Sequence, residues 1–509
     1  MSTSLEELIG SKLVIGFPGT KVTPEVVKQF KDIHAGGVIF YRINFESPQQ
    51  IRKVISDLES ALGRRLLVCV DHENGRVIMY RDGVTIFPDN LALGQTQDVT
   101  LAKEAGAIAA KELRALGTDV NFAPVLDVLT DAYSPNIGIR SFGKDWKLVC
   151  DMGAAYITAL QAGGVSATAK HFPGKGHAPV DAHLKLPTIT STWDEMKAVH
   201  LQPFIKAIQV GVDVIMSSHP KYSHLDDVPG HIATFSRRII TDCLRNELNF
   251  KGVVSSDDLE MGAIKEICPI GTAAVQTVAA GHDLVLSCHS FADQRAVYQA
   301  LLEAYKSKQL PAKELEESVE RIEKLKAKRP QRFEGTVGPD PKGAALAQTI
   351  SKRAVHIVHD TEKMLPLSNA LARDVGVIFP QLSSFAPKIM IEREFEDEVS
   401  YFHHLMGPFP GNHVTEVYGI EPSDEDIECA TNLAHRSTVT LFFCFDAHLY
   451  PAEQKLLAAL QSAARKLVVI FMRDPYDKTF LRSKDVGITA FGFRKCQLEA
   501  VVSRLYGEE

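Results

Sequence analysis

The chain has 509 residues, of which 45% are hydrophobic and 23% are charged, and its formal net charge at pH 7 is -7. This is the composition of an ordinary globular protein, and the length exceeds a single typical core, so we expect two domains. A mildly acidic chain without a long basic run argues against nucleic acid as a partner and against binding to an anionic membrane surface.

The sequence contains no stretch of about twenty uninterrupted apolar residues, and its N-terminal stretch MSTSLEELIGSKLVIGFPGT lacks the features of a secretory signal. We therefore expect a cytoplasmic protein that does not associate with a membrane. The eight cysteines lie far apart and never form a CxxC pair, which favours reduced side chains over disulfides or zinc ligands. We expect neither a metal nor another cofactor, and the oligomeric state stays open.

From the start of the chain to about residue 330, short β-rich runs alternate with longer segments of helical period, such as Leu101–Leu116. The runs are almost continuously apolar, as in strands that are buried on both faces. Repeated β/α units over this length favour a TIM-type (β/α)8 barrel over an open doubly wound sheet. The eight predicted strands begin at Lys12, Gly36, Leu66, Thr118, Val165, Val212, Lys251 and His282.

A segment rich in proline, glycine and charge, residues 331–343, is the predicted linker between a catalytic domain of residues 1–330 and a smaller α/β domain of residues 344–509. In the second domain, further apolar runs predict a mostly parallel sheet, and we expect a helix capped by Ser423 and another begun by Pro451. No cluster of ionisable groups is apparent there, which favours a structural or substrate-rim role. These runs begin at Val355, Val375, His413, Val439, Leu467 and Gly487.

The stretch Lys170–Pro187, reading KHFPGKGHAPVDAHLKLP, directly follows the fifth predicted strand. Gly174 and Gly176 would allow a sharp turn or a close approach of the backbone to a ligand. Asp181 could hold His183 in one tautomer and keep it basic enough to move a proton near neutral pH. This pair is the first candidate for acid and base chemistry.

Polar residues lie at the ends of four predicted strands and in the loop that follows a fifth. In a TIM-type barrel the carboxyl ends of the strands meet at one mouth, where catalytic groups are found. We therefore expect these side chains to converge on one site. They are Asp71, His72 and Glu73; Asn136, Arg140 and Ser141; Lys170 and His171; Ser217, Ser218 and His219; and Asp257 and Asp258.

Retaining glycoside hydrolysis needs a nucleophilic carboxylate on one side of the anomeric carbon and a proton donor on the other. Asp257 or Asp258 could be the nucleophile, and adjacent residues of an extended strand point to opposite faces, so one of them would reach the mouth. The residues alone also allow an aldolase or a hydrolase of another bond. A metal enzyme is a further alternative, with spacings that match no standard metal motif, and its ligands would be His171, His177, Asp181 and His183.

Lys170–Pro187 resembles the signature of glycoside hydrolase family 3, in the branch of the β-N-acetylhexosaminidases, whose pattern reads KHFPGHG, a spacer, DSH and LP. Residues 70–83, reading VDHENGRVIMYRDG, resemble the DQEGGRV segment of that family. Further segments match in order and extend the resemblance over nearly the whole first domain. They begin at Phe87, Asn121, Asn136, Leu201 and Gly252.

The resemblance implies a retaining exo-β-N-acetylglucosaminidase that removes terminal β-linked N-acetylglucosamine from cell-wall muropeptides or chito-oligosaccharides. It implies that Asp257 is the nucleophile that forms a glycosyl-aspartate, and that His183 is the acid/base, oriented by Asp181. The residues that resemble the sugar-binding residues of the family are Asp71, Arg140, Lys170 and His171.

The sequence departs from the family pattern at four positions. Lys175 stands in place of histidine, Ala182 in place of serine, His72 in place of glutamine and Asn74 in place of glycine. Two alternatives stay open beside hydrolysis. A histidine acid/base and the charge of Lys175 would also suit a β-N-acetylglucosaminide or β-glucoside phosphorylase, and a family member can be a catalytically silent sugar-binding protein.

Overall fold

The computed structural model describes residues 4–131, 134, 136–178, 186–328, 331–382 and 397–508. By its internal contacts the chain divides into two compact units. The barrel unit comprises Met1–Glu73, Ile78–Thr85 and Asp98–Gly343, and the sheet unit comprises Asn74–Val77, Ile86–Gln97 and Ala344–Glu509. The chain therefore enters the sheet unit directly after Glu73, far upstream of the predicted linker.

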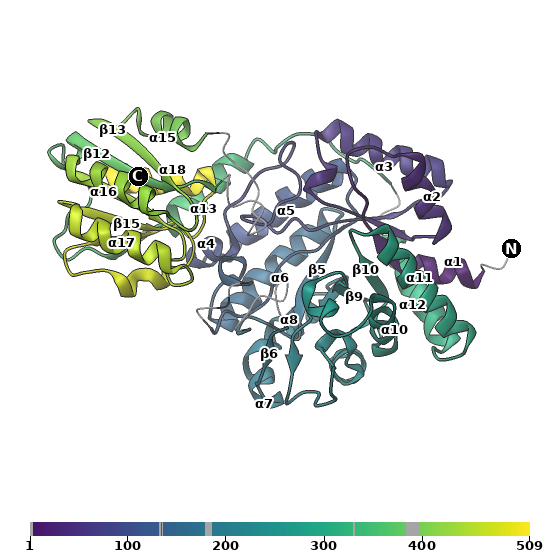
Figure 1. Cartoon of the computed structure of the whole chain (residues 1–509). Helices are drawn as coiled ribbons and strands as arrows, with labels where there is room; N and C mark the ends of the chain where they lie inside the picture. The colour runs from purple at the N-terminus through teal and green to yellow at the C-terminus, as the bar shows by residue number, and fades with distance from the viewer. Residues whose placement is uncertain are drawn as a thin grey trace. The chain divides into compact units, whose positions relative to one another are not determined.

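In the barrel unit, parallel strands close into a barrel in the order β1, β2, β3, β4, β5, β7, β9 and β10. Figure 1 labels β5, β9 and β10 of this barrel. Each strand coincides with one of the predicted apolar runs, so the TIM-type barrel is confirmed. Alternate residues such as Val14, Ile39 and Leu67 are buried together and fill the interior. The bounds are β1 Leu13–Ile15, β2 Gly37–Phe40, β3 Leu67–Val70, β4 Val120–Asn121, β5 Ser166–Phe172, β7 Val214–Ser217, β9 Val253–Asp258 and β10 Leu284–Ser287.

Helices connect the barrel strands, as the helical periods predict. The longest, α5, begins after Asp98, whose side chain accepts a hydrogen bond from the backbone N–H of Thr100, and ends at Gly117 in the left-handed region. The main helices are α1 Leu5–Ser11, α2 Pro24–Asp32, α3 Pro48–Leu62, α5 Val99–Leu116, α6 Trp146–Ala162, α8 Gln202–Gln209, η5 Arg238–Glu247, α10 Ile270–Ala280, α11 Phe291–Lys306 and α12 Ala312–Ala327.

Shorter elements lie in the loops of the barrel unit. A two-stranded parallel sheet is formed by β6 and β8, which precede and follow β7 along the chain. The bounds are η1 Arg42–Asn44, η2 Gly138–Arg140, β6 Thr188–Ile189, α7 Trp193–Glu195, η3 Met196–His200, β8 Lys221–Tyr222, η4 Ala233–Phe235 and α9 Gly262–Lys265.

The sheet unit contains a sheet of order β11, β16, β15, β14, β12 and β13, in which only β11 runs antiparallel to its neighbour among the described strands. This confirms the predicted mostly parallel sheet. Its bounds are β11 His356–His359, β12 Asp374–Pro380, β13 Asn412–Tyr418, β14 Val439–Cys444, β15 Leu467–Phe471 and β16 Val486–Thr489. Its helices are α4 Asn90–Gln95, α13 Gly343–Ala354, α15 Glu398–Met406, α16 Asp424–Arg436, α17 Pro451–Ala463 and α18 Lys495–Tyr506, with the short η6 Leu371–Arg373 and η7 Pro475–Phe480.

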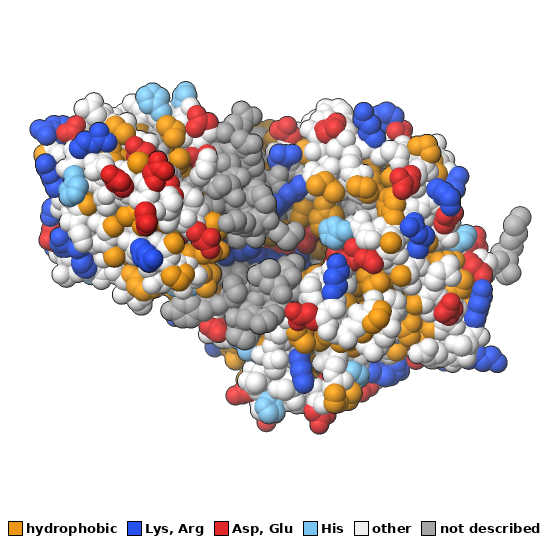
Figure 2. All heavy atoms as spheres, in the orientation of Figure 1, with side chains coloured by type: hydrophobic (Ala, Val, Ile, Leu, Met, Phe, Trp, Pro, Cys, Tyr) orange, Lys and Arg blue, Asp and Glu red, His pale blue; other side chains and the backbone are white. Residues whose placement is uncertain are grey.

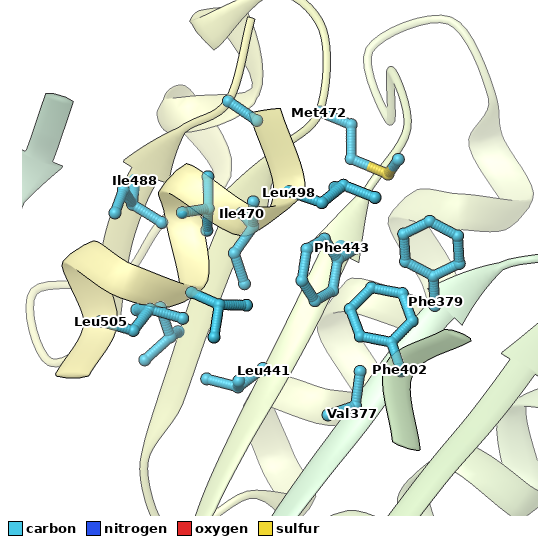
Figure 3. Close-up of a cluster of buried hydrophobic side chains, with 14 of the residues drawn as sticks. Val377, Phe379, Phe402, Leu441, Phe443, Ile470, Met472, Ile488, Leu498 and Leu505 are labelled. Atoms are coloured by element: carbon cyan, nitrogen blue, oxygen red, sulfur yellow. The ribbon is translucent and has the colours of Figure 1, made fainter. Parts of the chain in front are cut away.

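The central strands of this sheet are buried on both faces, which explains their continuous apolar runs. Val377, Leu441 and Ile470 point to one face and pack with Phe402 of α15 and Leu498 of α18 (Figure 3). The alternate residues of the same strands pack against α16 and α17 on the opposite face. Ser423 caps α16 and Pro451 begins α17, as predicted.

Ionisable residues gather where β14 and β15 end, contrary to the expectation that the second domain lacks such a cluster. Arg473 forms a buried ion pair with Asp446. The carboxylate of Asp477 accepts hydrogen bonds from the backbone N–H groups of Ala447 at 2.9 Å and His448 at 2.7 Å. Burial also raises the pKa of Asp474, and the neighbouring Asp446 adds to that rise.

The distribution of charge on the surface and the polarity of the helices agree with the composition of an ordinary globular protein. On the face that Figure 2 shows, acidic and basic side chains are interspersed rather than separated by sign. Within the described part of the chain, no helix is both long enough and apolar enough to cross a membrane. Five of the eight cysteines are buried, Cys268 and Cys496 are half-buried, and Cys429 is exposed.

Candidate active site

The described residues of the predicted site lie at the ends of barrel strands. Asp71 directly follows β3, and Lys170 and His171 lie near the end of β5. Asp257 is the penultimate residue of β9. Arg140 ends η2 in the loop after β4. Because parallel barrel strands open toward one mouth, these groups share one face of the barrel. The remaining predicted site residues, Asp181 and His183, lie outside the described residues, as does Ala182.

A buried carboxylate, Glu73, links the two cations of the site. Its oxygens accept hydrogen bonds from Arg140 Nε at 2.8 Å and Arg140 Nη2 at 2.6 Å, in a two-pronged pair. Lys170 Nζ lies 2.5 Å from Glu73 Oε1 and donates a hydrogen bond to Asp71 Oδ1, also at 2.5 Å. The side chain of Lys170 is only 1% exposed, so its charge depends on these carboxylates.

The two carboxylates of this network differ in their electrostatics. Burial alone would raise the pKa of Glu73, but the Arg140 guanidinium and the Lys170 ammonium reverse this and hold it well below its usual range. Burial raises the pKa of Asp71, Lys170 opposes that rise and the Glu73 charge adds to it. Glu73 is therefore the permanent counter-ion of the site. Asp71, whose side chain is 28% exposed, is the carboxylate that solvent or a ligand can reach.

His171 is held by Asp127, a residue that the sequence analysis did not single out for the site. The Nδ1 atom of His171 lies 2.7 Å from Asp127 Oδ2, and its Nε2 atom lies 3.4 Å from Arg140 Nη2. A carboxylate accepts and a guanidinium donates, so these partners select the tautomer with the proton on Nδ1. Burial raises the pKa of Asp127 to about 6, against the opposing effect of the Lys175 ammonium, so Asp127 is mainly ionised at neutral pH.

The adjacent aspartates of β9 have different surroundings. Asp257 Oδ1 accepts a hydrogen bond from the backbone N–H of Asp258 at 2.9 Å, and Asp257 Oδ2 lies 4.0 Å from Lys175 Nζ. Asp258 Oδ1 accepts hydrogen bonds from the backbone of Glu260 and Cys288, while its Oδ2 lies 3.1 Å from His289 Nε2. The carboxylate of Asp258 thus holds the backbone of Glu260 and Cys288. The side chain of Asp257 is 20% exposed and is the more accessible of the two.

Two departures from the family pattern have local explanations. The backbone N–H of His72 donates to Asn121 Oδ1 at 3.0 Å, and its ring Nδ1 accepts from the backbone N–H of Met79 at 3.3 Å. Asn74 has a φ of 94°, in the left-handed region, where glycine is favoured and asparagine is one of the better-tolerated side chains.

Of the histidines of the predicted metal alternative, His177 has other partners, whereas His183 and the carboxylate of Asp181 lie outside the described residues. His177 Nε2 lies 2.9 Å from Ser191 Oγ, and its ring stacks on His200 with centroids 3.9 Å apart. Among the residues that the structure describes, no group of three or more histidine, cysteine, aspartate or glutamate side chains could hold a metal ion.

A barrel with carboxylates and sugar-type hydrogen-bonding groups at its mouth suits the glycoside-cleaving class of enzymes. Residues 4–325 match the family model described as the glycosyl hydrolase family 3 N-terminal domain. This match spans more than half of the sequence, and the chain belongs to glycosyl hydrolase family 3. The resemblance stated from the sequence is therefore confirmed, and the chain is a glycoside hydrolase.

Curated relatives match part of the chain. A protein named β-hexosaminidase from Methylobacillus flagellatus is 35% identical over 283 residues, which is 54% of this chain and 80% of the relative. Another of the same name from Haemophilus influenzae is 36% identical over 296 residues, which is 57% of this chain and 82% of the relative.

Solved structures match over both units. A family 3 β-N-acetylglucosaminidase from Paenibacillus has a TM-score of 0.92 and 30% identity, and the match covers 100% of this chain and 97% of that one. A β-glucoside phosphorylase has a TM-score of 0.81 at 19% identity, and a likeness at that identity shows the fold alone.

We predict that Glu73→Gln lowers the free energy of unfolding by about 3 kcal/mol at pH 7, because Lys170 and Arg140 lose a buried counter-ion. The pKa of Glu73 is lowered in the folded state, so its contribution is present above about pH 4.5 and is lost as the pH falls through the folded value. The measurement is urea unfolding followed by circular dichroism from pH 3 to 8.

The matched control is Glu46→Gln, which changes an exposed glutamate that accepts a hydrogen bond from Thr20 Oγ1. We expect this control to change stability by less than about 0.5 kcal/mol. A loss for Glu73→Gln no larger than that of the control would contradict a counter-ion role for Glu73.

Proposed function

We propose that this chain is a retaining exo-β-N-acetylglucosaminidase that hydrolyses terminal β-linked N-acetylglucosamine through a covalent glycosyl-aspartate. Two findings support the sugar: the name β-hexosaminidase of the curated relatives and the full-length likeness to a β-N-acetylglucosaminidase at 30% identity. The observation that carries the chemistry is the pairing of an accessible carboxylate, Asp257, with the cationic network around Glu73 at the same barrel mouth. The natural substrates would be muropeptides or chito-oligosaccharides in the cytoplasm.

In the first step, a carboxylate oxygen of Asp257 attacks the anomeric carbon. The bond from that carbon to the leaving oxygen breaks, and its electron pair takes a proton from His183. The backbone N–H of Asp258, which holds Asp257 Oδ1 at 2.9 Å, fixes the rotation of the carboxylate for this attack. Such positioning removes much of the entropic cost of bringing the two reacting atoms together.

In the second step, His183 acts as the base and removes a proton from water, and the water oxygen attacks the same carbon. The ester bond to Asp257 breaks, and its electron pair returns to the carboxylate. Attack twice from opposite faces retains the β configuration. Asp181 would orient His183 and stabilise its protonated form, as an aspartate does for histidine in other hydrolases.

The sugar would be held by groups whose own positions are fixed. Asp71 would accept hydrogen bonds from ring hydroxyls, while Lys170 and Arg140 would donate to them. Because Glu73 already holds both cations, binding needs little further ordering of long side chains. Buried polar groups left unpaired by a wrong sugar would reduce its turnover steeply.

We expect turnover of 4-nitrophenyl β-N-acetylglucosaminide to exceed that of the matching β-glucoside by at least about a hundredfold in kcat/KM. Release of 4-nitrophenolate with each substrate measures this ratio. Equal turnover of the two sugars would contradict the assignment to N-acetylglucosamine, and binding of the sugar without turnover would identify a sugar-binding protein instead.

Replacing the nucleophile should abolish the intermediate. Asp257→Asn is expected to lower kcat by roughly a thousandfold or more, because an amide is a poor nucleophile. Mass spectrometry of acid-quenched reactions should detect a glycosyl adduct in the native protein and none in this variant. The matched control is Asp258→Asn, which makes the same change at the adjacent residue. This variant should still form the adduct. An adduct in Asp257→Asn would show that another residue attacks.

Removal of the acid should depend on the leaving group. We expect His183→Ala to lose roughly a hundred- to ten-thousand-fold in kcat/KM on substrates with poor leaving groups and far less on activated aryl glycosides. A series of aryl β-N-acetylglucosaminides with leaving groups of different pKa measures this slope. His177→Ala serves as the control and should leave the slope unchanged. Equal losses of His183→Ala across the series would remove the acid role.

A further inference from the structure

Lys175 is a buried cation beside the proposed nucleophile, at a position where the family pattern has histidine. Its side chain is 2% exposed, and its Nζ atom lies 4.0 Å from Asp257 Oδ2. At this separation the attraction is mainly Coulombic, and it is strengthened by the low effective dielectric of a site with little solvent. The nucleophile of this chain therefore faces a fixed positive charge.

The backbone around Lys175 is held on several sides. The backbone N–H of Lys175 donates to Asp127 Oδ1 at 2.6 Å, and its carbonyl accepts from the backbone N–H of Ala178 at 3.0 Å. Tyr222 donates its hydroxyl to the carbonyl of Gly174 at 2.8 Å. A Cβ atom at Gly176 would lie 2.0 Å from the carbonyl oxygen of Val128, so glycine is needed for this close approach. The ammonium group is thus presented from a rigid segment.

Other titratable groups also face this region. His219 lies on the segment after β7, and burial lowers its pKa despite the nearby Asp257 carboxylate, so it is neutral at neutral pH. Asp258 is paired with His289, whose pKa that carboxylate raises. Asp127 accepts hydrogen bonds from the backbone N–H groups of His171 and Lys175. Asp257 thus has an anionic neighbour in Asp258, a neutral one in His219 and a cationic one in Lys175.

We propose that Lys175 is a positioning residue that acts through Asp257, keeping this carboxylate ionised before attack and favouring its departure from the glycosyl ester. The inference rests on the proposed function, because it takes Asp257 as the nucleophile. It goes beyond that function by giving a role to a residue that departs from the family pattern.

The two chemical steps change the charge of Asp257 in opposite directions. Attack on the anomeric carbon consumes the carboxylate charge, so the Lys175 ammonium does not assist this change. In the second step water adds to the same carbon, its proton goes to the base, and the ester electron pair returns to Asp257 as negative charge. A nearby ammonium stabilises that developing charge, so Lys175 accelerates release of the sugar from the enzyme.

The test compares Lys175→Met with the native chain on 4-nitrophenyl β-N-acetylglucosaminide. An opposite charge at this distance lowers the pKa of a carboxylate by about one to three units, so its removal should move the acidic limb of the kcat/KM profile upward by at least about one pH unit. Above that limb, kcat should fall about tenfold or more while kcat/KM changes only a few-fold, because kcat includes release of the sugar. Because release of the sugar is slowed, more glycosyl adduct should be found in quenched reactions of Lys175→Met than in those of the native chain.

Two further variants make the result independent of a loss of side-chain volume. Lys175→Arg keeps the charge and should keep the native acidic limb. If Lys175→Met does not fold, the comparison of Lys175→Arg with Lys175→His takes its place. Lys175→His should resemble Lys175→Met above about pH 7, where imidazole is neutral. The control Lys221→Met removes a half-buried lysine at β8 and should leave the profile unchanged.

The outcomes separate this inference from the proposed function. If Asp257→Asn abolishes the adduct while Lys175→Met keeps the native acidic limb, or while Lys175→Met or Lys175→His keeps the native ratio of kcat to kcat/KM above about pH 7, the role of Lys175 is overturned and the proposed function stands. If Asp257→Asn still forms the adduct, the nucleophile assignment fails and the role of Lys175 fails with it.

Discussion

The site depends on the sharing of one buried carboxylate, that of Glu73, between Lys170 and Arg140. Removing two cations from water costs several kcal/mol for each ion, and this is offset only by close, well-aligned partners. Glu73 supplies such partners because it follows Asp71 by two residues on the extension of β3, across from the end of β5. The two cations are thereby neutralised and ordered by the fold itself.

The groups of the proposed site differ in how they are supported. Asp257 belongs to a barrel strand, and the backbone of Asp258 fixes its carboxylate. His171 belongs to another strand, and Asp127 fixes its tautomer. The proposed acid/base pair comes from the sequence that follows the rigid segment around Lys175. The proposed nucleophile and the proposed sugar-binding groups are thus placed by the barrel itself.

Much of the architecture could be predicted because strands buried on both faces leave continuous apolar runs, such as those from Leu66 and Val439. The motif around Lys170 indicated the mouth of the barrel because it directly follows a predicted strand in the sequence. Glu73 was expected at the mouth, but its partners and the role of Asp127 could not be predicted, because both carboxylates meet their partners only when the barrel closes. The ion pair of Asp446 and Arg473 was missed likewise, since its members are separate in sequence and meet only at the ends of adjacent strands.

The course of the chain after Glu73 has a consequence for how this protein can be divided. Residues 74–77 and 86–97 are part of the sheet unit, where Arg494 donates to the carbonyl of Gly75 and the Asp89 carboxylate accepts from the backbone N–H of Arg76. A gene cut at any single point therefore separates one unit from segments that belong to it. Shortening such a gene to its barrel-coding half would require replacement of these upstream segments as well.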